Sequence, residues 1–179
     1  GSIYITGHTG GDLDEEINNG NLDAFISKYN SNGDKQWTRL FGTSYHDFGT
    51  ALTTGNDGSI YIAGSTVVID HETNNVDLDA FISKYNPNGD KIWTSLLGST
   101  ESGLGYELTT GLDGSIYIAG NTKGDLDGQT NSGNYDVFVS KYNPDGTKIW
   151  TSLLGSLDWD WGSDLTTGND GSIYIAGYT

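Results

Sequence analysis

Short runs of alternating apolar and polar side chains follow one another along the chain. Residues 3–6 form a β-branched and aromatic run, which favours a strand. Residues 23–29 alternate in the way expected of a strand, whose successive side chains point to opposite faces. Similar runs occupy residues 35–41 and 51–54, and no apolar pattern with a helical period appears. The chain is therefore predicted to be all-β.

Glycine, asparagine and aspartate separate these runs. Residues 30–34, 86–90 and 143–147 are turns in which asparagine and glycine supply the required backbone conformations. Pro87 and Pro144 stand at the second position of the later two, where the fixed φ of proline fits a type I or II turn. Each of these segments is predicted to connect two neighbouring antiparallel strands.

One segment, Gly-Ser-Ile-Tyr-Ile-Ala-Gly, occurs at residues 58–64, 114–120 and 171–177, and nearly unchanged at residues 1–7. Successive copies begin 57, 56 and 57 residues apart. A regular period of this size largely decides the fold. Asp-Gly, a strong hairpin signal, opens each later copy. The chain divides into three repeats and the start of a fourth: residues 1–57, 58–113, 114–170 and 171–179.

Each repeat of about 57 residues holds four short strands, with apolar residues on both faces of some, as in residues 92–97. Such a sheet must be packed between other sheets, which predicts the four-stranded antiparallel blades of a β-propeller. The Gly-Ser-Ile-Tyr-Ile-Ala-Gly segment is expected to open each blade. A linear β-solenoid is the alternative, although its coils are usually shorter. A propeller normally needs four to eight blades, so the three repeats form part of a longer array, or an oligomer completes the ring.

The chain is strongly acidic, with 24 Asp and Glu against 8 Lys and Arg and a net charge of −16. This charge repels nucleic-acid phosphates and anionic membranes, so neither is an expected partner. No apolar run approaches the length of a membrane helix, so no membrane insertion is expected. Cysteine is absent, which excludes disulfides and thiol chemistry. Six lysines recur in register and are interpreted as strand-surface charges: Lys28, Lys84, Lys141, Lys35, Lys91 and Lys148.

The long loop after the first strand of a repeat is the first candidate site. Hard cations such as Ca²⁺ prefer carboxylate, amide and carbonyl oxygens, which this Asp-x-Asp loop supplies. The candidate calcium ligands are Asp12, Asp14, Asp23, Asp125, Asp127 and Asp136. In the second repeat, residues 66–69 replace the Asp-x-Asp and the acids move to Asp70, Glu72 and Asp77. The alternative is that these are solvated acids, with the aspartate that begins each second strand bonded to backbone amides.

The variable loop after the tryptophan strand is the second candidate. Its residues of interest form a candidate ligand or assembly surface: Tyr45, Asp47, Asp158, Trp159, Asp160 and Trp161. Aromatic rings beside carboxylates suit sugar binding, because rings stack on sugars and carboxylates accept from hydroxyls. The alternative is packing between blades or between protomers. Trp37, Trp93 and Trp150 recur in register and are interpreted as packing residues.

These motifs together resemble the bacterial SBBP-type β-propeller repeat family. That family has an Asp-Gly-x-x-Tyr-x-x-Gly segment, then Asp-Ala-Phe-x-x-Lys, a glycine turn, and a tryptophan strand that ends in Leu-Gly. The matching residues of the second repeat are Asp57, Gly58, Tyr61, Gly64, Asp79, Ala80, Phe81, Lys84, Gly89, Trp93, Leu97 and Gly98. The third repeat matches in the same order, with Val137 in place of the alanine. The resemblance implies a propeller in a secreted or cell-surface protein and no single activity.

The sequence therefore predicts a non-enzymatic, structural or adhesive propeller segment that assembles with further repeats or copies of itself, or binds another partner. Calcium is a candidate stabilising cofactor. A lectin-like module that binds an extracellular glycan is the alternative function. Ser44, His46 and Asp47 contain the residue types of a catalytic triad, but no nucleophile elbow accompanies them, and no catalytic residue is expected.

Overall fold

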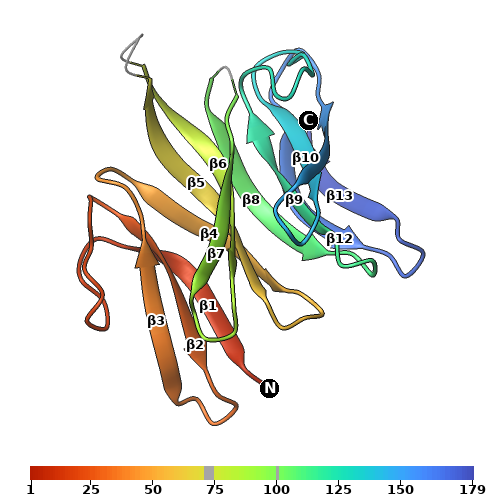
Figure 1. Cartoon of the computed structure of the whole chain (residues 1–179). Helices are drawn as coiled ribbons and strands as arrows, with labels where there is room; N and C mark the ends of the chain where they lie inside the picture. The colour runs from red at the N-terminus through yellow and green to blue at the C-terminus, as the bar shows by residue number, and fades with distance from the viewer. Residues whose placement is uncertain (71–74, 100) are drawn as a thin grey trace.

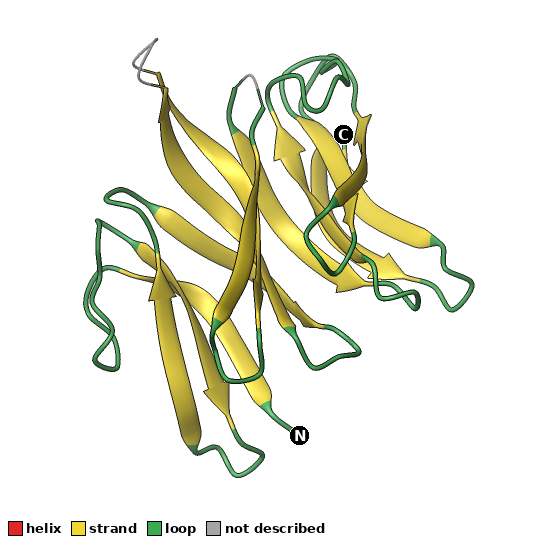
Figure 2. Cartoon of the chain, in the orientation of Figure 1, coloured by secondary structure: helices red, strands yellow, loops and turns green. Residues whose placement is uncertain are grey.

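The computed structural model describes residues 1–70, 75–99 and 101–179, and these ranges form thirteen β-strands (Figures 1 and 2). They contain no helix of the length and apolarity needed to cross a membrane. The strands are β1 (Ile3–Thr9), β2 (Asp23–Tyr29), β3 (Lys35–Phe41), β4 (Asp47–Thr54), β5 (Ile60–Asp70), β6 (Asn75–Tyr85), β7 (Lys91–Leu97), β8 (Gly103–Thr110), β9 (Ile116–Thr122), β10 (Asp136–Tyr142), β11 (Lys148–Leu154), β12 (Trp161–Thr167) and β13 (Ile173–Tyr178).

The strands form four antiparallel sheets in which sequence neighbours pair: sheet 1 (β1–β3), sheet 2 (β4–β7), sheet 3 (β8–β11) and sheet 4 (β12–β13). Figure 1 shows the sheets following one another from the N-terminal to the C-terminal side. The predictions of an all-β chain and of four-stranded antiparallel sheets are confirmed, the latter by sheets 2 and 3.

Sheets 2, 3 and 4 each begin one strand earlier than the sequence repeat. The strand β4, at the end of the first repeat, pairs with β5, so that Leu52 lies opposite Ile62. The turn between them is held locally: Gly58 has a φ of +78° and Asp57 accepts a hydrogen bond of 2.9 Å from the Ser59 amide. The expectation that the Gly-Ser-Ile-Tyr-Ile-Ala-Gly segment opens each sheet was wrong for sheets 2, 3 and 4, because there it forms the second strand.

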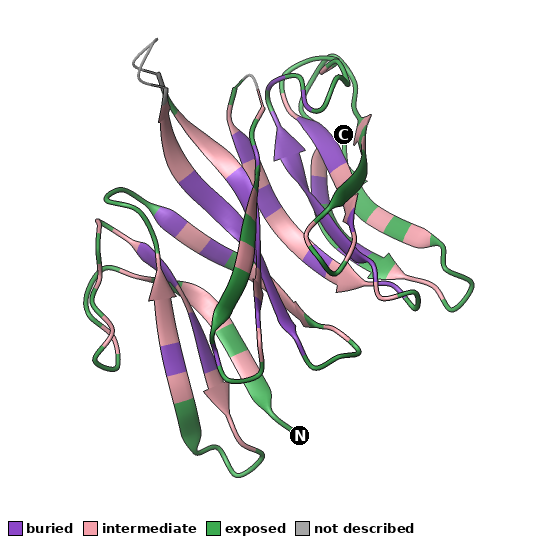
Figure 3. Cartoon of the chain, in the orientation of Figure 1, coloured by how far each residue is buried: buried purple, intermediate pink, exposed green. Residues whose placement is uncertain are grey.

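The second and third strands of a sheet carry most of the core. In β5, Ile60 and Ile62 pack toward sheet 1, whereas Tyr61 and Ala63 pack toward sheet 3, and all four are at most 1% exposed. Figure 3 shows buried positions concentrated in these middle strands. Residues 92–97, predicted to be buried on both faces, lie in the last strand of sheet 2, where Ile92 and Leu96 remain half-exposed. The prediction that residues 92–97 are buried on both faces was therefore wrong, whereas β5 is buried on both faces.

Threonine hydroxyls connect the first strands of successive sheets. Thr50 Oγ1 in β4 donates to the Gly105 carbonyl in β8 over 2.7 Å. Thr110 Oγ1 in β8 donates back to Thr54, and Thr167 Oγ1 in β12 donates to the Thr110 carbonyl over 3.1 Å. The strands β4, β8 and β12 therefore lie next to one another along one side of the stack.

Candidate functional site

The two candidate loops of a repeat lie side by side. Leu22, in the acidic loop, forms a parallel bridge with His46, in the variable loop, and the Asp47 amide donates to the Leu22 carbonyl over 2.8 Å. The third repeat makes the same bridge between Tyr135 and Trp159. The sequence treated these loops as separate sites, but the backbone joins them into one surface in the first and third repeats.

The acidic loop contains a tight turn that starts with leucine and aspartate. In the first repeat, Asp14 and the residue after it have φ values of +53° and +69°. In the third repeat, Asp127 and Gly128 have φ values of +52° and +76°. Two successive positive φ values are typical of a type I′ turn, for which Asp-Gly is a favoured sequence. The leucine before each aspartate forms an antiparallel bridge across the turn.

The turn aspartate binds a lysine and a threonine of its own sheet. The Asp14 carboxylate accepts from Lys35 Nζ, and from Thr38 Oγ1 over 2.5 Å. The hydrogen bond from Lys35, followed by that from Thr38, lowers the pKa of Asp14. The third repeat contains the same arrangement, made by Asp127, Lys148 and Thr151. These two candidate calcium ligands therefore already have a cationic partner.

The first aspartate of each Asp-x-Asp points elsewhere. Asp12 Oδ1 accepts from the Asn18 amide over 2.9 Å, and Asp125 Oδ1 accepts from the Asn131 amide over the same distance. Both carboxylates thus fold the loop onto itself. The described ranges contain no group of three or more His, Cys, Asp or Glu residues that could hold a metal ion. Calcium binding therefore stays a prediction.

Asp23 and Asp47 form a buried pair of carboxylates. Asp23 is fully buried, and its Oδ2 accepts from the Asn19 amide over 2.9 Å while its Oδ1 has no hydrogen-bond partner among the described residues. Asp47 Oδ2 accepts from the Thr43 amide over 2.6 Å. Both face the backbone of Gly42, where an added Cβ would lie 2.5 Å from Asp23 Oδ1 and 2.9 Å from Asp47 Oδ2.

The third repeat places Asp136 and Asp160 at the equivalent positions. Asp136 accepts from the Ser132 amide over 2.9 Å, and its Oδ1 is also buried without a partner. Asp160 is buried as well and accepts from a backbone amide of its loop, that of Ser156. The prediction that the aspartate at the start of the second strand bonds backbone amides is confirmed for Asp23 and Asp136.

Four aromatic rings gather on the variable loop of the third repeat. Tyr135 lies 5.1 Å from Trp159 and 5.6 Å from Trp161, which also contacts Tyr106 at 5.7 Å between ring centroids. Trp159 is 55% exposed. Tyr106 is more buried, and this burial raises its pKa to about 12. We refer to these four residues as the aromatic platform. The sequence identified both tryptophans but missed the tyrosines, which replace Leu22 and Thr50 of the first repeat.

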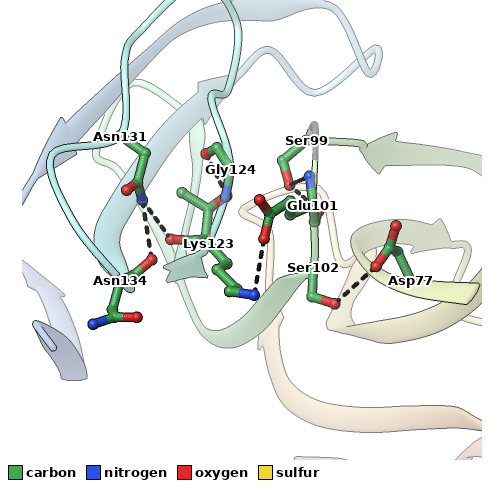
Figure 4. A network of polar contacts seen from close by, with 9 residues as sticks. Asp77, Ser99, Glu101, Ser102, Lys123, Gly124, Asn131 and Asn134 are labelled. Carbon is green, nitrogen blue, oxygen red and sulfur yellow. Dashed lines mark hydrogen bonds and ion pairs between the residues drawn. The ribbon is translucent and has the colours of Figure 1, made fainter. Parts of the chain in front are cut away.

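A polar network extends from the acidic loop of the third repeat to β6 (Figure 4). Lys123 Nζ pairs with Glu101 over 3.0 Å, and the hydrogen bond to Glu101 is the main reason that the pKa of Lys123 is raised. Ser102 Oγ donates to Asp77 of β6 over 3.3 Å, and Asn131 Nδ2 donates to the Thr122 carbonyl over 3.0 Å. The network connects the loops of sheet 3 with sheet 2.

A second recurring arrangement connects the opposite ends of the sheets. Lys28 Nζ, in sheet 1, donates to the Pro87 carbonyl in the turn of sheet 2 over 2.8 Å. The Trp37 ring covers Gly89 of the same turn, where an added Cβ would lie 3.1 Å from the ring. We refer to this lysine and tryptophan as the turn clamp, because together they hold the turn of the next sheet.

Sheet 2 holds the turn of sheet 3 in the same way. Lys84 Nζ and Trp93 Nε1 both donate to the Pro144 carbonyl, over 3.0 and 3.3 Å. The interpretation of these lysines as simple surface charges was wrong for Lys28 and Lys84, which bind a neighbouring sheet. The interpretation of Trp37 and Trp93 as packing residues is confirmed.

Comparison with known proteins supports only the repeat character. No family model matches the chain. The chain is 29% identical to a regulatory protein, FlaEY, of Caulobacter vibrioides over 98% of its own length and 20% of that relative. It is 24% identical to an uncharacterized WD repeat-containing protein, L264, of Acanthamoeba polyphaga mimivirus, over 86% of its own length and 14% of the relative. The chain thus spans a fifth or less of these relatives, one of which is named for its WD repeats.

Proposed function

We propose that the chain is a non-enzymatic β-propeller module that assembles by stacking its end sheets against further sheets of the same kind. The turn clamp is the observation that carries this proposal. The clamp holds a turn between sheets 1 and 2 and between sheets 2 and 3. At one end of the stack a clamp without a turn is exposed, and at the other end a turn without a clamp. The linked first strands β4, β8 and β12 are consistent with sheets arranged around an axis.

The C-terminal end presents the clamp without a turn. Lys141 pairs with Asp113 and lies over the Tyr117 ring, and Trp150 is 38% exposed. Trp93, in the equivalent position of sheet 2, is covered by Gly146. An exposed tryptophan beside a lysine is a ready contact surface, because tryptophan is enriched at the centre of protein interfaces.

The N-terminal end presents the turn without a clamp. Gly33, the glycine of the first turn, has nothing within 4 Å of an added Cβ. Ile3 and Ile5 of β1 are 51% and 46% exposed, whereas the equivalent Ile60 and Ile62 of β5 are fully buried. The open turn of sheet 1 and the open clamp of sheet 3 are therefore complementary, and contacts between different faces of identical molecules build rings or open arrays.

Sedimentation velocity over a range of protein concentrations tests this proposal. The chain is expected to associate end to end, while Trp150→Ala and Ile5→Lys, each with one damaged face, remain monomeric. An equimolar mixture of the two variants is expected to form dimers and nothing larger, because each retains the face that the other lacks. Leu157→Ala, at an 83% exposed position on a loop, is the control and should behave like the unaltered chain. A monomer at every concentration would overturn the proposal.

The secreted or cell-surface location is part of the same proposal. Its support is the resemblance of the repeat to SBBP-type propellers, and its expected partners are extracellular proteins, glycans or further copies. Detection of the protein on intact, unpermeabilised cells or in the medium tests the location, and recovery from the cell interior alone would contradict it.

The aromatic platform favours glycan binding as a second candidate function. The exposed Trp159 stacks on Trp161 at 6.3 Å, and Asp158 stands beside them with an exposed side chain. Flat rings next to carboxylates suit the apolar faces and hydroxyls of sugars. Titration of tryptophan fluorescence with a panel of polysaccharides tests this function. A spectrum that no polysaccharide changes, in the unaltered chain and in Trp159→Ala alike, would exclude it.

A further inference from the structure

A cleft of about 720 Å³ lies between sheet 1 and sheet 2. Its apolar wall includes Phe41 from sheet 1 and Phe81 and Leu96 from sheet 2. Lys91 and Thr94, both from β7, also line it. The cleft therefore combines aromatic and aliphatic surface with a cation and a hydroxyl.

In its described residues, the second repeat lacks the turn that covers this place in the other two, and the cleft lies there instead. In the first repeat the loop between β1 and β2 folds back as the leucine–aspartate turn described above, and in the third repeat the loop between β9 and β10 does the same. In the second repeat, residues 66–69 continue β5, and Val67 and Ile69 pair with Leu78 and Val76 of β6. The described part of this connection therefore extends β5 and β6 and contains no turn that covers the last two strands of sheet 2.

The residues that receive the turn aspartate are nevertheless present in the second repeat. The Ser83 and Thr94 hydroxyls share a hydrogen bond of 2.7 Å, as Ser27 and Thr38 do over 2.8 Å. Thr38 Oγ1 donates a hydrogen bond to Asp14, whereas Thr94 contacts no carboxylate in the described part of the chain. Lys91, the counterpart of Lys35 and Lys148, likewise has no acidic partner among the described residues.

The place of the turn leucine is also open. Leu126 of the third repeat is 1% exposed and packs into the core between sheets 2 and 3, near Phe138 and Leu153. The counterparts of Phe138 and Leu153 in the cleft are Phe81 and Leu96, and Leu96 is 50% exposed. Burial of a leucine side chain is favourable because it removes apolar surface from water, so an occupant with a leucine here would be favoured.

We propose that this cleft binds a tight turn of a partner polypeptide in which a leucine precedes an aspartate. The leucine packs among Phe41, Phe81 and Leu96. The aspartate accepts from Lys91 Nζ and Thr94 Oγ1, as Asp127 does from Lys148 and Thr151 inside the third repeat. The chain thus carries its own template for the ligand, and the inference is independent of end-to-end assembly.

A cyclised peptide with the sequence of residues 124–131 is the probe. It contains Asp127-Gly128, whose sequence favours the turn, and closing the ring reduces the entropy lost on binding. Fluorescence anisotropy of the labelled peptide, titrated with the full chain, is expected to show saturable binding. A peptide with asparagine in place of this aspartate is expected to bind about tenfold more weakly, because it loses the ion pair and its charged hydrogen bonds.

The matched variants are Lys91→Ala and Lys148→Ala. Lys91→Ala should weaken binding about tenfold, while Lys148→Ala, at a place already filled by Asp127, should change the affinity by less than about twofold. Thr94→Val removes the second donor and should also weaken binding, which gives a test that does not depend on Lys91. Thermal unfolding of each variant checks that the fold is retained.

Three results would overturn the inference: no binding of the peptide, equal affinity of the aspartate and asparagine peptides, or equal losses in Lys91→Ala and Lys148→Ala.

Discussion

The indole of Trp93 lies on the backbone of Gly146, the glycine in the turn between β10 and β11. An added Cβ at Gly146 would stand 3.0 Å from the indole ring. The φ of Gly146 is +92°, so the glycine serves both the turn and the close approach of the neighbouring sheet. The contact joins two sheets that share no backbone pairing, and it is one half of the turn clamp.

Gly146→Ala is expected to destabilise the chain more than Gly33→Ala does. Gly33 has nearly the same backbone conformation, with a φ of +87°, but nothing lies within 4 Å of an added Cβ. Both variants have the cost of a left-handed alanine, about 1–2 kcal/mol. Gly146→Ala should also displace Trp93, which should lower the free energy of unfolding by about 1 kcal/mol more. Urea unfolding measures the difference, and equal losses would mean that the indole contact contributes nothing.

Lys84→Ala is expected to cost more stability than Lys141→Ala. Both lysines pair with an aspartate and lie over a tyrosine ring. Only Lys84 also donates to the Pro144 carbonyl of the next sheet. A hydrogen bond from a charged group contributes about 1.5–3 kcal/mol, and an exposed ion pair about 0–1 kcal/mol.

Unfolding in urea, measured for both lysine variants in the same buffer, gives the comparison. A Lys84→Ala variant as stable as Lys141→Ala would show that the hydrogen bond to Pro144 does not stabilise the stack.

The sequence predicted the strands well because they depend on local chemistry. Alternation, β-branched residues and Asp-Gly turns act over a few neighbours, so residues 23–29 could be assigned as a strand without further information. It could not tell where one sheet ends. The connection within sheet 2, residues 55–59, and the connection from sheet 2 to sheet 3, residues 98–102, have the same length. Only packing of the whole strands decides which connection crosses between sheets.

The candidate site was predicted in part. The sequence selected Asp14 as a ligand, but its partners Lys35 and Thr38 lie 21 and 24 residues away, and their approach depends on the fold of the loop. The change at residues 66–69 was visible in the sequence. Its consequence, a cleft next to Lys91, was not, because that requires the position of the missing turn on the sheet.

Calcium is expected to raise the melting temperature through Asp23 rather than through Asp14. Asp23 Oδ1 is buried without a partner and faces Asp47, so a cation there would neutralise two carboxylates. The Asp14 carboxylate is already bound by Lys35 and Thr38. Ca²⁺ at ten times its dissociation constant would stabilise the chain by about 1.4 kcal/mol, a shift of a few degrees.

Differential scanning fluorimetry with Ca²⁺ and with a chelator measures this shift. Asp23→Asn should abolish the response and Asp14→Asn should retain it. An unaltered chain whose melting temperature changes with neither addition would rule out calcium as a stabilising cofactor. Loss of the response in Asp14→Asn would place the calcium site at the turn of Asp14 instead.

Asp79→Asn is expected to change how stability depends on pH. Burial, together with the nearby charge of Asp77, raises the pKa of Asp79 to about 6 from the usual 3.8. The folded state therefore binds a proton more tightly than the unfolded state does. Between about pH 4 and pH 6, this carboxyl makes the free energy of unfolding fall as the pH rises, and its penalty is complete above about pH 6.

The asparagine variant does not have this penalty. Relative to the unaltered chain, it should gain about 2 kcal/mol of stability between pH 4 and pH 7, allowing for the partial exposure of the carboxyl. Asp57→Asn is the control of opposite sign, because the Ser59 amide lowers the pKa of Asp57. Its loss of stability should be present at neutral pH and fade as the pH falls below about 4. Parallel pH profiles for Asp79→Asn and the unaltered chain would show that Asp79 ionises as freely in the folded state as in the unfolded one.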